Sequence, residues 1–251
     1  MHFTGTIWRP PYEANSLLIE VTAGCTHHKC KFCTLYDDLP FKFRMTPMED
    51  VEADLAETQT QLRSWQSRQV KRVYLVGANP FVLKFEHLKE IANLIHKYFP
   101  ECETIGCFSR VTDITLKTDE ELRRLGYDGL TIGVETGDDV ALAFMNKGYK
   151  AQEIVEQTHH LDKVNITYNY FYLTGVSGAG HGVEGALESA KIFNMTRPKI
   201  IGSSMLTIFP ESELYQEIQD GNWAEEGELE KVCNPDNEAA LRHYRTNLQH
   251  L

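Results

Sequence analysis

The sequence predicts an α/β fold made of six consecutive units, each a β-strand followed by a helix. Short apolar, β-branched segments alternate with longer segments of helical pattern, the order expected for a parallel sheet with crossover helices. Of the 251 residues, 42% are hydrophobic and 24% are charged, close to the averages for globular proteins. With right-handed crossovers, six units form either a flat, doubly wound sheet or a curved, incompletely closed barrel. Periodicity alone does not choose between the two.

The expected strands are short apolar runs bounded by glycine, proline or polar residues. The second one, RVYLVG, is almost continuously apolar, which is typical of a strand buried on both faces. The fifth one, NITYNYFYL, is rich in aromatic and β-branched residues. The six predicted strands cover residues 17–22, 72–77, 103–109, 129–135, 165–173 and 199–209.

Helix start signals follow most of these strands. Thr118 and Glu121 form the pattern of a capping box, and Thr46 is expected to cap a helix that has Pro47 at its first position. The other expected helices cover 85–99, 150–161, 182–194 and 210–219. Residues 1–221 are therefore predicted to form one domain. Residues 222–251 are predicted to form a short C-terminal helical tail and not a separate domain.

Charge and hydropathy narrow the classes of partner. The net charge of −11 disfavours a large nucleic-acid interface, because phosphate binding requires clustered Lys and Arg. No segment reaches the roughly 20 apolar residues that span a bilayer. The first residues, MHFTGTIWRPPYE, lack a cationic start followed by an apolar run. We therefore expect a soluble, cytoplasmic protein that does not bind membranes and has no large nucleic-acid interface.

Three cysteines lie close together after the first strand, at Cys25, Cys30 and Cys33, with the spacing Cys-x4-Cys-x2-Cys. Thiolates this close on a loop that begins at Gly24 are suited to a soft metal or an iron–sulfur cluster. In a chain expected to be intracellular, such a group indicates metal binding rather than disulfides. The remaining cysteines are scattered, and we expect plain buried side chains at Cys102, Cys107 and Cys233.

Several metal groups fit this loop on chemistry alone. In a four-iron cluster, three protein thiolates leave the fourth iron open to a ligand from outside the chain. A plant-type [2Fe–2S] site needs a fourth cysteine, and the next one, Cys102, lies beyond a predicted strand and helix. A zinc site with three cysteines and either His27 or His28 is also chemically possible.

Small and polar residues recur at the carboxyl ends of the predicted strands. In both candidate architectures this edge is the functional face. Repeated glycines there indicate that the backbone approaches a ligand closely. After the second to the sixth strands the segments are Gly77-Ala78-Asn79-Pro80, Ser109-Arg110, Glu135-Thr136-Gly137, Gly175 to Gly180, and Thr207 with Phe209.

The cysteine loop and the order of these segments resemble the radical SAM superfamily over nearly the whole chain. The usual loop of that superfamily is Cys-x3-Cys-x2-Cys, so this chain has one extra residue in the first gap. Residues 9–14, RPPYEA, also resemble a group of bacterial members with the longer gap. The resemblance implies a partial (β/α)6 TIM-like barrel. It also implies a [4Fe–4S] cluster held by Cys25, Cys30 and Cys33.

The resemblance further implies how S-adenosylmethionine (SAM) is bound. The segment Gly77-Ala78-Asn79-Pro80 resembles loosely the one that contacts the methionine amino group, although Asn79 replaces the acidic residue common there. Glu135 would contact the ribose hydroxyls or the methionine part, and a buried carboxylate needs a partner, for which Arg110 is one candidate. The implied cofactor-binding residues are Phe32 near the adenine, Gly77, Ala78, Asn79, Ser109 and Arg110 near the carboxylate, Glu135, Gly175 and Thr207.

The activity implied is reductive cleavage of SAM to a 5′-deoxyadenosyl radical, which then acts on a substrate that the sequence does not identify. A reduced flavodoxin or ferredoxin would supply the electron, and a small molecule or a partner chain would be the substrate. The alternative function is a non-catalytic iron–sulfur or zinc-binding module that uses the same loop.

Overall fold

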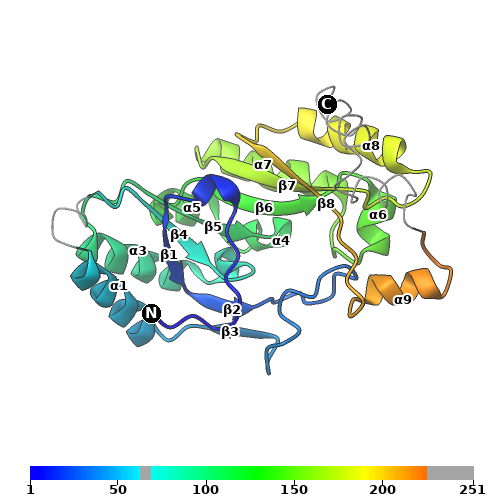
Figure 1. Cartoon of the computed structure of the whole chain (residues 1–251). Coiled ribbons are helices and arrows are strands. Elements are labelled where there is room, and N and C mark those ends of the chain that lie inside the picture. Colours follow the sequence, from blue (N-terminus) through cyan, green and yellow to red (C-terminus); the bar gives the residue numbers. More distant parts are fainter. Residues whose placement is uncertain (63–68, 225–251) are drawn as a thin grey trace. The chain divides into compact units, whose positions relative to one another are not determined.

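The computed structural model describes residues 1–62 and 69–224. Its main sheet has six strands in the order β1-β4-β5-β6-β7-β8, so neighbouring strands follow one another along the chain (Figure 1). The registers given for the β1–β4, β4–β5, β5–β6 and β7–β8 pairs are all parallel. This confirms the α/β class and the six predicted strands. Their bounds are β1 Leu17–Glu20, β4 Arg72–Val76, β5 Thr104–Ser109, β6 Leu130–Glu135, β7 Tyr168–Thr174 and β8 Ile201–Met205.

The predicted helices are present, and Thr118 caps its helix through the expected box with Glu121. The prediction that Thr46 caps the first helix is wrong: the N-cap is Pro47, with no side-chain cap bond. The Thr46 amide instead donates to the Val21 carbonyl, so its backbone is still bonded to the chain that follows β1. The helices are α1 Met48–Gln61, α3 Phe85–Tyr98, α4 Val111–Ile114, α5 Asp119–Leu125, α6 Asp139–Phe144, α7 Ala151–Lys163, α8 Gly182–Asn194 and α9 Glu213–Gln219, with 3-10 turns η1 Pro11–Glu13 and η2 Pro80–Val82.

A small antiparallel hairpin, β2 Thr22–Gly24 with β3 Phe43–Met45, was not predicted. The strand expected over residues 17–22 divides at Val21 into β1 and β2. Three-residue strands carry too little alternation to be recognised in a sequence. The hairpin matters because it closes the base of the segment that holds the cysteines.

The chain forms two compact units, and the first contains residues 1–28, 35–133 and 157–169. Helices α1 and α3 lie side by side in it, beside β1 and β4 (Figure 1). Near the amino end of β4, Arg72 pairs with the buried carboxylate of Glu13 at 2.6 Å. The core of this unit combines buried aromatic rings, such as Tyr74, Phe81 and Phe99, with buried aliphatic side chains that include Ile19, Leu55, Leu75, Leu88, Ile91 and Ile105.

The second unit contains residues 29–34, 134–156 and the chain from Tyr170 onward. Strands β7 and β8 pair within it, and the rings of Tyr170 and Tyr172 contact Phe193 of α8. Its buried cluster comprises Ala141, Met145, Leu173, Val176, Leu206 and Leu214, with Phe32 of the cysteine loop packed against it.

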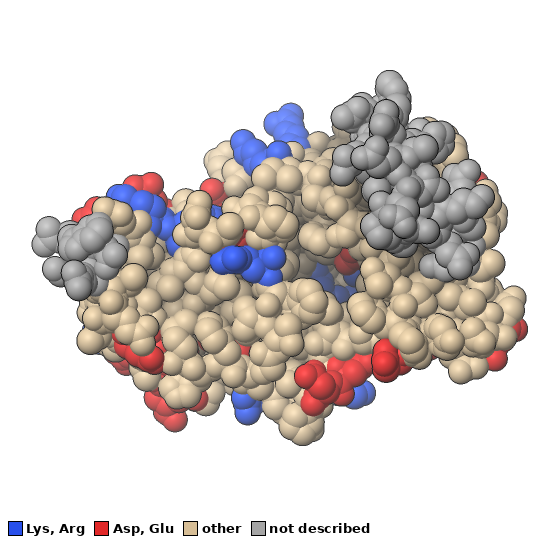
Figure 2. All heavy atoms as spheres, viewed as in Figure 1, with Lys and Arg blue, Asp and Glu red and all other residues tan. Residues whose placement is uncertain are grey.

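Two expectations concern the chain as a whole. The division into a domain over 1–221 and a tail over 222–251 stays a prediction, and most of the tail lies outside the described residues. In the described part, no helix is long and apolar enough to cross a membrane. On the face seen in Figure 2, Lys and Arg side chains lie in small separate groups and not in one continuous patch.

Candidate functional site

The three clustered cysteines differ from the other described cysteines in exposure. Cys25, Cys30 and Cys33 are each half-buried, whereas Cys102 and Cys107 are buried. Burial raises the pKa of the Cys107 thiol, so that side chain stays protonated and inert. The loop residues keep the access that a metal group requires. Cys25 belongs to the first compact unit, and Cys30 and Cys33 belong to the second.

The hairpin fixes where the cysteine loop begins. The Cys25 amide donates to the Lys42 carbonyl at 2.8 Å. Gly24 has a φ of +78°, and a Cβ there would lie 2.2 Å from the Lys42 carbonyl oxygen. Only glycine combines this left-handed conformation with so close a backbone approach. The glycine that begins the loop is therefore required by the turn itself.

A buried amide holds the first half of the loop. Asn79, with no exposed surface, donates through Nδ2 to Thr26 Oγ1 at 2.8 Å. The same Nδ2 lies 3.1 and 3.3 Å from the two carboxylate oxygens of Asp113. Asp113 is 2% exposed and also accepts the Arg110 amide at 2.8 Å. The residue after Cys25 is thus tied to the segments that follow β4 and β5.

Burial governs the charges around this network. Burial raises the pKa of Asp113, although the hydrogen bonds from the Arg110 amide and from Asn79 act to lower it. Burial also lowers the pKa of the Lys117 ammonium to about 8, although the negative charge of Asp113 acts to raise it. Lys117 donates to the Phe81 carbonyl and lies over the Phe81 ring, 4.4 Å from its centroid. These groups support the ends of β4 and β5 from within the first unit.

The two histidines of the loop do not complete a single-metal site. His28 lies 2.9 Å from Asp37 Oδ1 through Nε2, and its backbone has a φ of +45°. Among residues 1–62 and 69–224, no three His, Cys, Asp or Glu side chains are arranged to hold one metal ion. The ligands of a cluster bind different iron atoms, so they are spaced more widely than ligands of one ion.

The second half of the loop is held by the second unit. The Lys31 amide donates to the Met145 carbonyl at 3.2 Å, and the Lys31 carbonyl accepts the Leu214 amide at 2.8 Å. The Lys31 ammonium pairs with Glu217 of α9 and lies 4.4 Å from the centroid of the Phe144 ring. The amide and the carbonyl of Lys31 are therefore both bonded to the backbone, one to the segment that follows α6 and the other to α9. These bonds hold the neighbouring Cys30 and Phe32 in place.

The segment that follows α6 carries a buried ion pair. Lys147 Nζ lies 3.0 Å from Glu135 Oε1, with the two side chains 6% and 12% exposed. The same Nζ is 5.8 Å from the centroid of the Phe32 ring. Burial alone would lower the pKa of Lys147, but the charges of Glu135, Tyr149 and Cys30 raise it above its usual value. Lys147 is therefore an observed partner of Glu135 that was not predicted.

Glu135 occupies a strained backbone position. Its φ of +61° lies in the left-handed region, which is uncommon for a residue other than glycine. The following residues are fixed by Ser189 of α8, whose hydroxyl contacts Thr136 Oγ1 at 2.9 Å and accepts the Gly137 amide at 2.8 Å. Such strain is maintained only where the surroundings enforce it, and it concentrates at functional sites.

The other predicted cofactor-binding residues fall into three groups. Gly77 has a φ of +127°, and a Cβ there would lie 2.1 Å from Thr22 Oγ1, so its glycine is required by packing. Ser109 is buried and donates to the Arg110 carbonyl. Surface remains at the half-buried Ala78, Arg110 and Gly175 and at the exposed Thr207. In the first unit the structure brings Asn79 close to Arg110 through Asp113. In the second it brings Phe32 close to Glu135 through Lys147.

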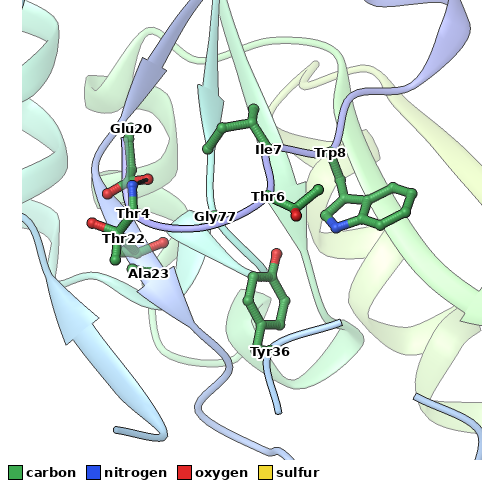
Figure 3. Close-up of a pocket in the computed structure, with 9 residues that line it drawn as sticks. All are labelled: Thr4, Thr6, Ile7, Trp8, Glu20, Thr22, Ala23, Tyr36 and Gly77. Carbon is green, nitrogen blue, oxygen red and sulfur yellow. Dashed lines mark hydrogen bonds between the residues drawn. The ribbon is translucent and has the colours of Figure 1, made fainter. Parts of the chain in front are cut away.

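A small pocket in the first unit lies beside the start of the loop (Figure 3). Tyr36 points toward Thr6, and Glu20 lies next to Thr4 and Thr22. The Glu20 carboxylate accepts the Thr4 amide at 2.8 Å, while its other oxygen and the Thr22 hydroxyl are buried without a hydrogen-bond partner. The empty space of about 200 Å³, part of it open to solvent, is below the usual range for ligand sites. It suits water better than a nucleoside.

Two functional candidates were missed in the sequence, Lys147 and Asp113. Both are polar residues in segments that follow a strand end, and both prove to be almost fully buried. Lys147 lies in the run Met145-Asn146-Lys147-Gly148, which resembles part of the ribose-binding region of the superfamily, but that resemblance assigned no role to the lysine itself. Asp113 lies in a helix of four residues, which has no detectable periodicity.

Comparison with known proteins places these features in a family. Residues 19–181 match the model of the radical SAM superfamily. The heme chaperone HemW of Buchnera aphidicola subsp. Schizaphis graminum is 21% identical over 189 residues, which cover 74% of this chain and 50% of that protein. The chain thus spans about half the length of this curated relative.

Solved structures of similar fold are radical SAM enzymes. Coproporphyrinogen III oxidase (HemN) from Escherichia coli matches with a TM-score of 0.62 and 15% identity, over 94% of this chain and 52% of that one. The methyltransferase TsrM from Kitasatospora setae, solved with cobalamin and a [4Fe–4S] cluster, matches with a TM-score of 0.60 and 14% identity, over 82% and 37%. At these identities the likeness shows the fold, a partial TIM barrel. The family model covers well over half of the chain, and the protein therefore belongs to the radical SAM superfamily.

Proposed function

We propose that this protein is a radical SAM enzyme in which Cys25, Cys30 and Cys33 hold a [4Fe–4S] cluster and SAM binds at its open iron. The observation that carries the proposal is the contrast between three half-buried thiols in one short loop and the buried thiols of Cys102 and Cys107. Thiolate ligands must be reachable by iron and sulfide, whereas a structural cysteine need not be.

The donor set fits this group. Three thiolates satisfy three irons of a cubane and leave one for the amino and carboxylate groups of SAM. The loop that carries them is anchored at Cys25 by the hairpin and at Lys31 by backbone bonds to Met145 and Leu214. When bound, the cluster and SAM supply the electron transfer and the 5′-deoxyadenosyl radical.

The chain's own contribution is binding and orientation. We propose that Phe32 provides an apolar wall beside the adenine and that Glu135 orients the ribose or methionine part. Gly77, Ala78, Ser109, Arg110, Gly175 and Thr207 would line the rest of the SAM site at the strand ends. Because the amide of Asn79 already binds Thr26 and Asp113, we assign it the task of holding the loop.

We assign no substrate. The related proteins are a heme chaperone, an oxidase of coproporphyrinogen III and a methyltransferase, and this chain spans only part of each. We propose a flavodoxin or ferredoxin as the reductant, and a small molecule or partner chain as the substrate, acting in the cytoplasm.

The direct test is SAM cleavage. The protein is purified without oxygen, reconstituted with iron and sulfide, reduced, and supplied with SAM, and 5′-deoxyadenosine is quantified. We expect product from the unchanged protein and from Cys102→Ala, a matched control that removes a buried thiol. Cys30→Ala should lose the cluster absorbance and the product. A clustered, reduced protein that forms no more 5′-deoxyadenosine than Cys30→Ala would refute the enzymatic proposal.

A second candidate is a cluster-binding protein without radical chemistry. Asn79 favours it, because the position where the superfamily commonly has an acidic residue is occupied by a fully buried amide. The similarity to a heme chaperone suggests heme as the ligand in that case. A hemin titration followed at the Soret band tests it. Stoichiometric hemin binding together with an intact cluster and no 5′-deoxyadenosine would support this candidate over the first.

A further inference from the structure

The ion pair between Lys147 and Glu135 is unusual for its burial. Both side chains are almost completely excluded from water, and one member of the pair stands on strained backbone. Removing two charges from water is costly unless their geometry is good, and a buried pair often stabilises a fold no better than apolar residues would. Stability alone is therefore a weak reason for this pair, and its location points to another role.

The pair lies against the second half of the cysteine loop. Lys147 Nζ is 5.8 Å from the centroid of Phe32, and the amide of Lys31 is bonded to the carbonyl of Met145. Residues 30–32 and 145–147 are therefore neighbours. The charge of Cys30 is one of the causes that raise the pKa of Lys147.

The ammonium of Lys31, the residue that follows Cys30, is directed toward helix α9. The Lys31 ammonium is paired with Glu217 and lies 3.7 Å from Glu213, both on α9. Its charge is offset by two carboxylates in a partly exposed position. Lys147 pairs with the Glu135 carboxylate and has almost no water around it, so its field at Cys30 is screened less.

We propose that Lys147 tunes the reduction potential of the cluster held by the cysteine loop. Its buried ammonium, which the ion pair with Glu135 fixes near Cys30, raises that potential. This inference rests on the proposed function, since it requires a cluster at Cys25, Cys30 and Cys33. It extends that function by assigning a role to a lysine that is not a ligand.

The physical basis is Coulombic. Reduction places one more negative charge on the cluster, and a nearby cation stabilises the reduced form. The two members of the pair act in opposite senses. Losing the cation makes reduction harder, whereas losing the carboxylate leaves the cation uncompensated and makes reduction easier. A purely structural role predicts no such opposition, because both changes would simply loosen the loop.

The test is a redox titration of the reconstituted protein without SAM, followed by the electron paramagnetic resonance signal of the reduced cluster. We expect Lys147→Gln to shift the midpoint potential to a more negative value and Glu135→Gln to shift it to a more positive one. Both substitutions keep polar side chains that can still pair, which limits unfolding. Arg72→Gln serves as the control, because it removes the cation of another pair near the amino end of β4 and should leave the potential unchanged.

The outcomes separate the two ideas. Opposite shifts in the two variants, with iron content equal to that of the unchanged protein, support the inference. Equal potentials, or shifts of the same sign, overturn it while leaving the proposed function standing. Absence of any [4Fe–4S] signal in the unchanged protein overturns both.

Discussion

The two halves of the cysteine loop are held by different chemistry. The half near Cys25 is held by the neutral side-chain amide of Asn79, which donates to Thr26 and also to the buried carboxylate of Asp113. The half near Cys30 is tied by backbone bonds to Lys31 and lies beside the Lys147–Glu135 ion pair. One short loop thus depends on two separate sets of contacts, one in each compact unit.

The two sets of contacts affect different properties of the loop, its position in one half and its electrostatics in the other. A hydrogen-bond network fixes geometry, and breaking it leaves a buried group unsatisfied at a cost of about 1–3 kcal/mol. A buried ion pair costs about 3–5 kcal/mol when one partner is removed, because a charge remains without compensation. It also projects a field onto whatever lies beside it. We therefore expect damage near Asn79 to displace the loop, and damage near Lys147 to alter its electrostatics as well.

The largest effect is expected from Lys147→Met. The Glu135 carboxylate would be left buried without its cation, so we expect a loss of about 3–5 kcal/mol in the free energy of unfolding, measured by urea titration. The double variant Lys147→Met/Glu135→Leu should recover most of this loss, because it removes both charges.

A matched control for that change is Lys191→Met in α8. Lys191 pairs with Glu188 of the same unit, but the two side chains are 67% and 44% exposed. Exposed pairs contribute little, so the urea midpoint should hardly move. Equal losses in Lys147→Met and Lys191→Met would mean that burial of the first pair has no energetic consequence, contrary to the comparison above.

A smaller, pH-dependent effect is expected from Asn79→Asp. The new carboxyl would lie where Nδ2 now stands, 3.1 to 3.3 Å from the Asp113 oxygens. Burial already raises the pKa of Asp113, and a second carboxylate would raise it further. We expect a loss of about 1–3 kcal/mol at neutral pH, seen in urea titrations.

The sign of the pH dependence follows from that raised pKa. Below the ordinary carboxyl pKa of about 4, both groups are protonated in either state and the repulsion is absent. As pH rises through the raised folded-state pKa, ionisation makes the variant progressively less stable than the unchanged protein. A stability difference that stays constant from pH 4 to pH 8 would show that the two carboxyls do not interact.

The architecture and the metal loop were predictable because both are repetitive or local. Each apolar run, such as RVYLVG, is a pattern contained within a few residues, and six of them recur along the chain. The metal loop is equally local, because its glycine and three cysteines lie close together in the sequence. The hairpin of β2 and β3 was not predictable, because Thr22–Gly24 pairs with residues across the whole cysteine loop. Three residues supply no alternation from which to infer that pairing.

The contact between Glu135 and Lys147 was not predictable from the sequence. Glu135 was expected to need a counter-charge, and the sequence offered Arg110 at another strand end. The structure shows Lys147 as a partner, twelve residues further along the same segment. Which cation meets a buried carboxylate depends on how the chain returns after β6. The left-handed turn at Glu135 and the bonds from Ser189 decide that path, and neither is encoded in a pattern.

The smallest effect is expected from Glu217→Gln, which removes the carboxylate that pairs with Lys31 on the partly exposed side of the loop. The bond from Lys31, followed by that from Asn222, lowers the pKa of Glu217. A carboxyl with a lowered pKa contributes stability above its ordinary pKa of about 4 and loses it as pH falls through the lowered value. The variant should therefore be slightly less stable than the unchanged protein at pH 7 and equal to it near pH 2, measured by thermal melting.

Salt provides the control for that last change, since exposed ion pairs are screened and buried pairs much less so. We expect 1 M salt to abolish the small difference made by Glu217→Gln while leaving the large difference made by Lys147→Met. If both differences vanish in salt, water and ions reach Lys147 as readily as Lys31, and the second half of the loop has no cation beside Cys30 that is protected from screening by salt. If both persist, Lys31 acts on the loop as strongly as Lys147, and the distinction between the two lysines is lost.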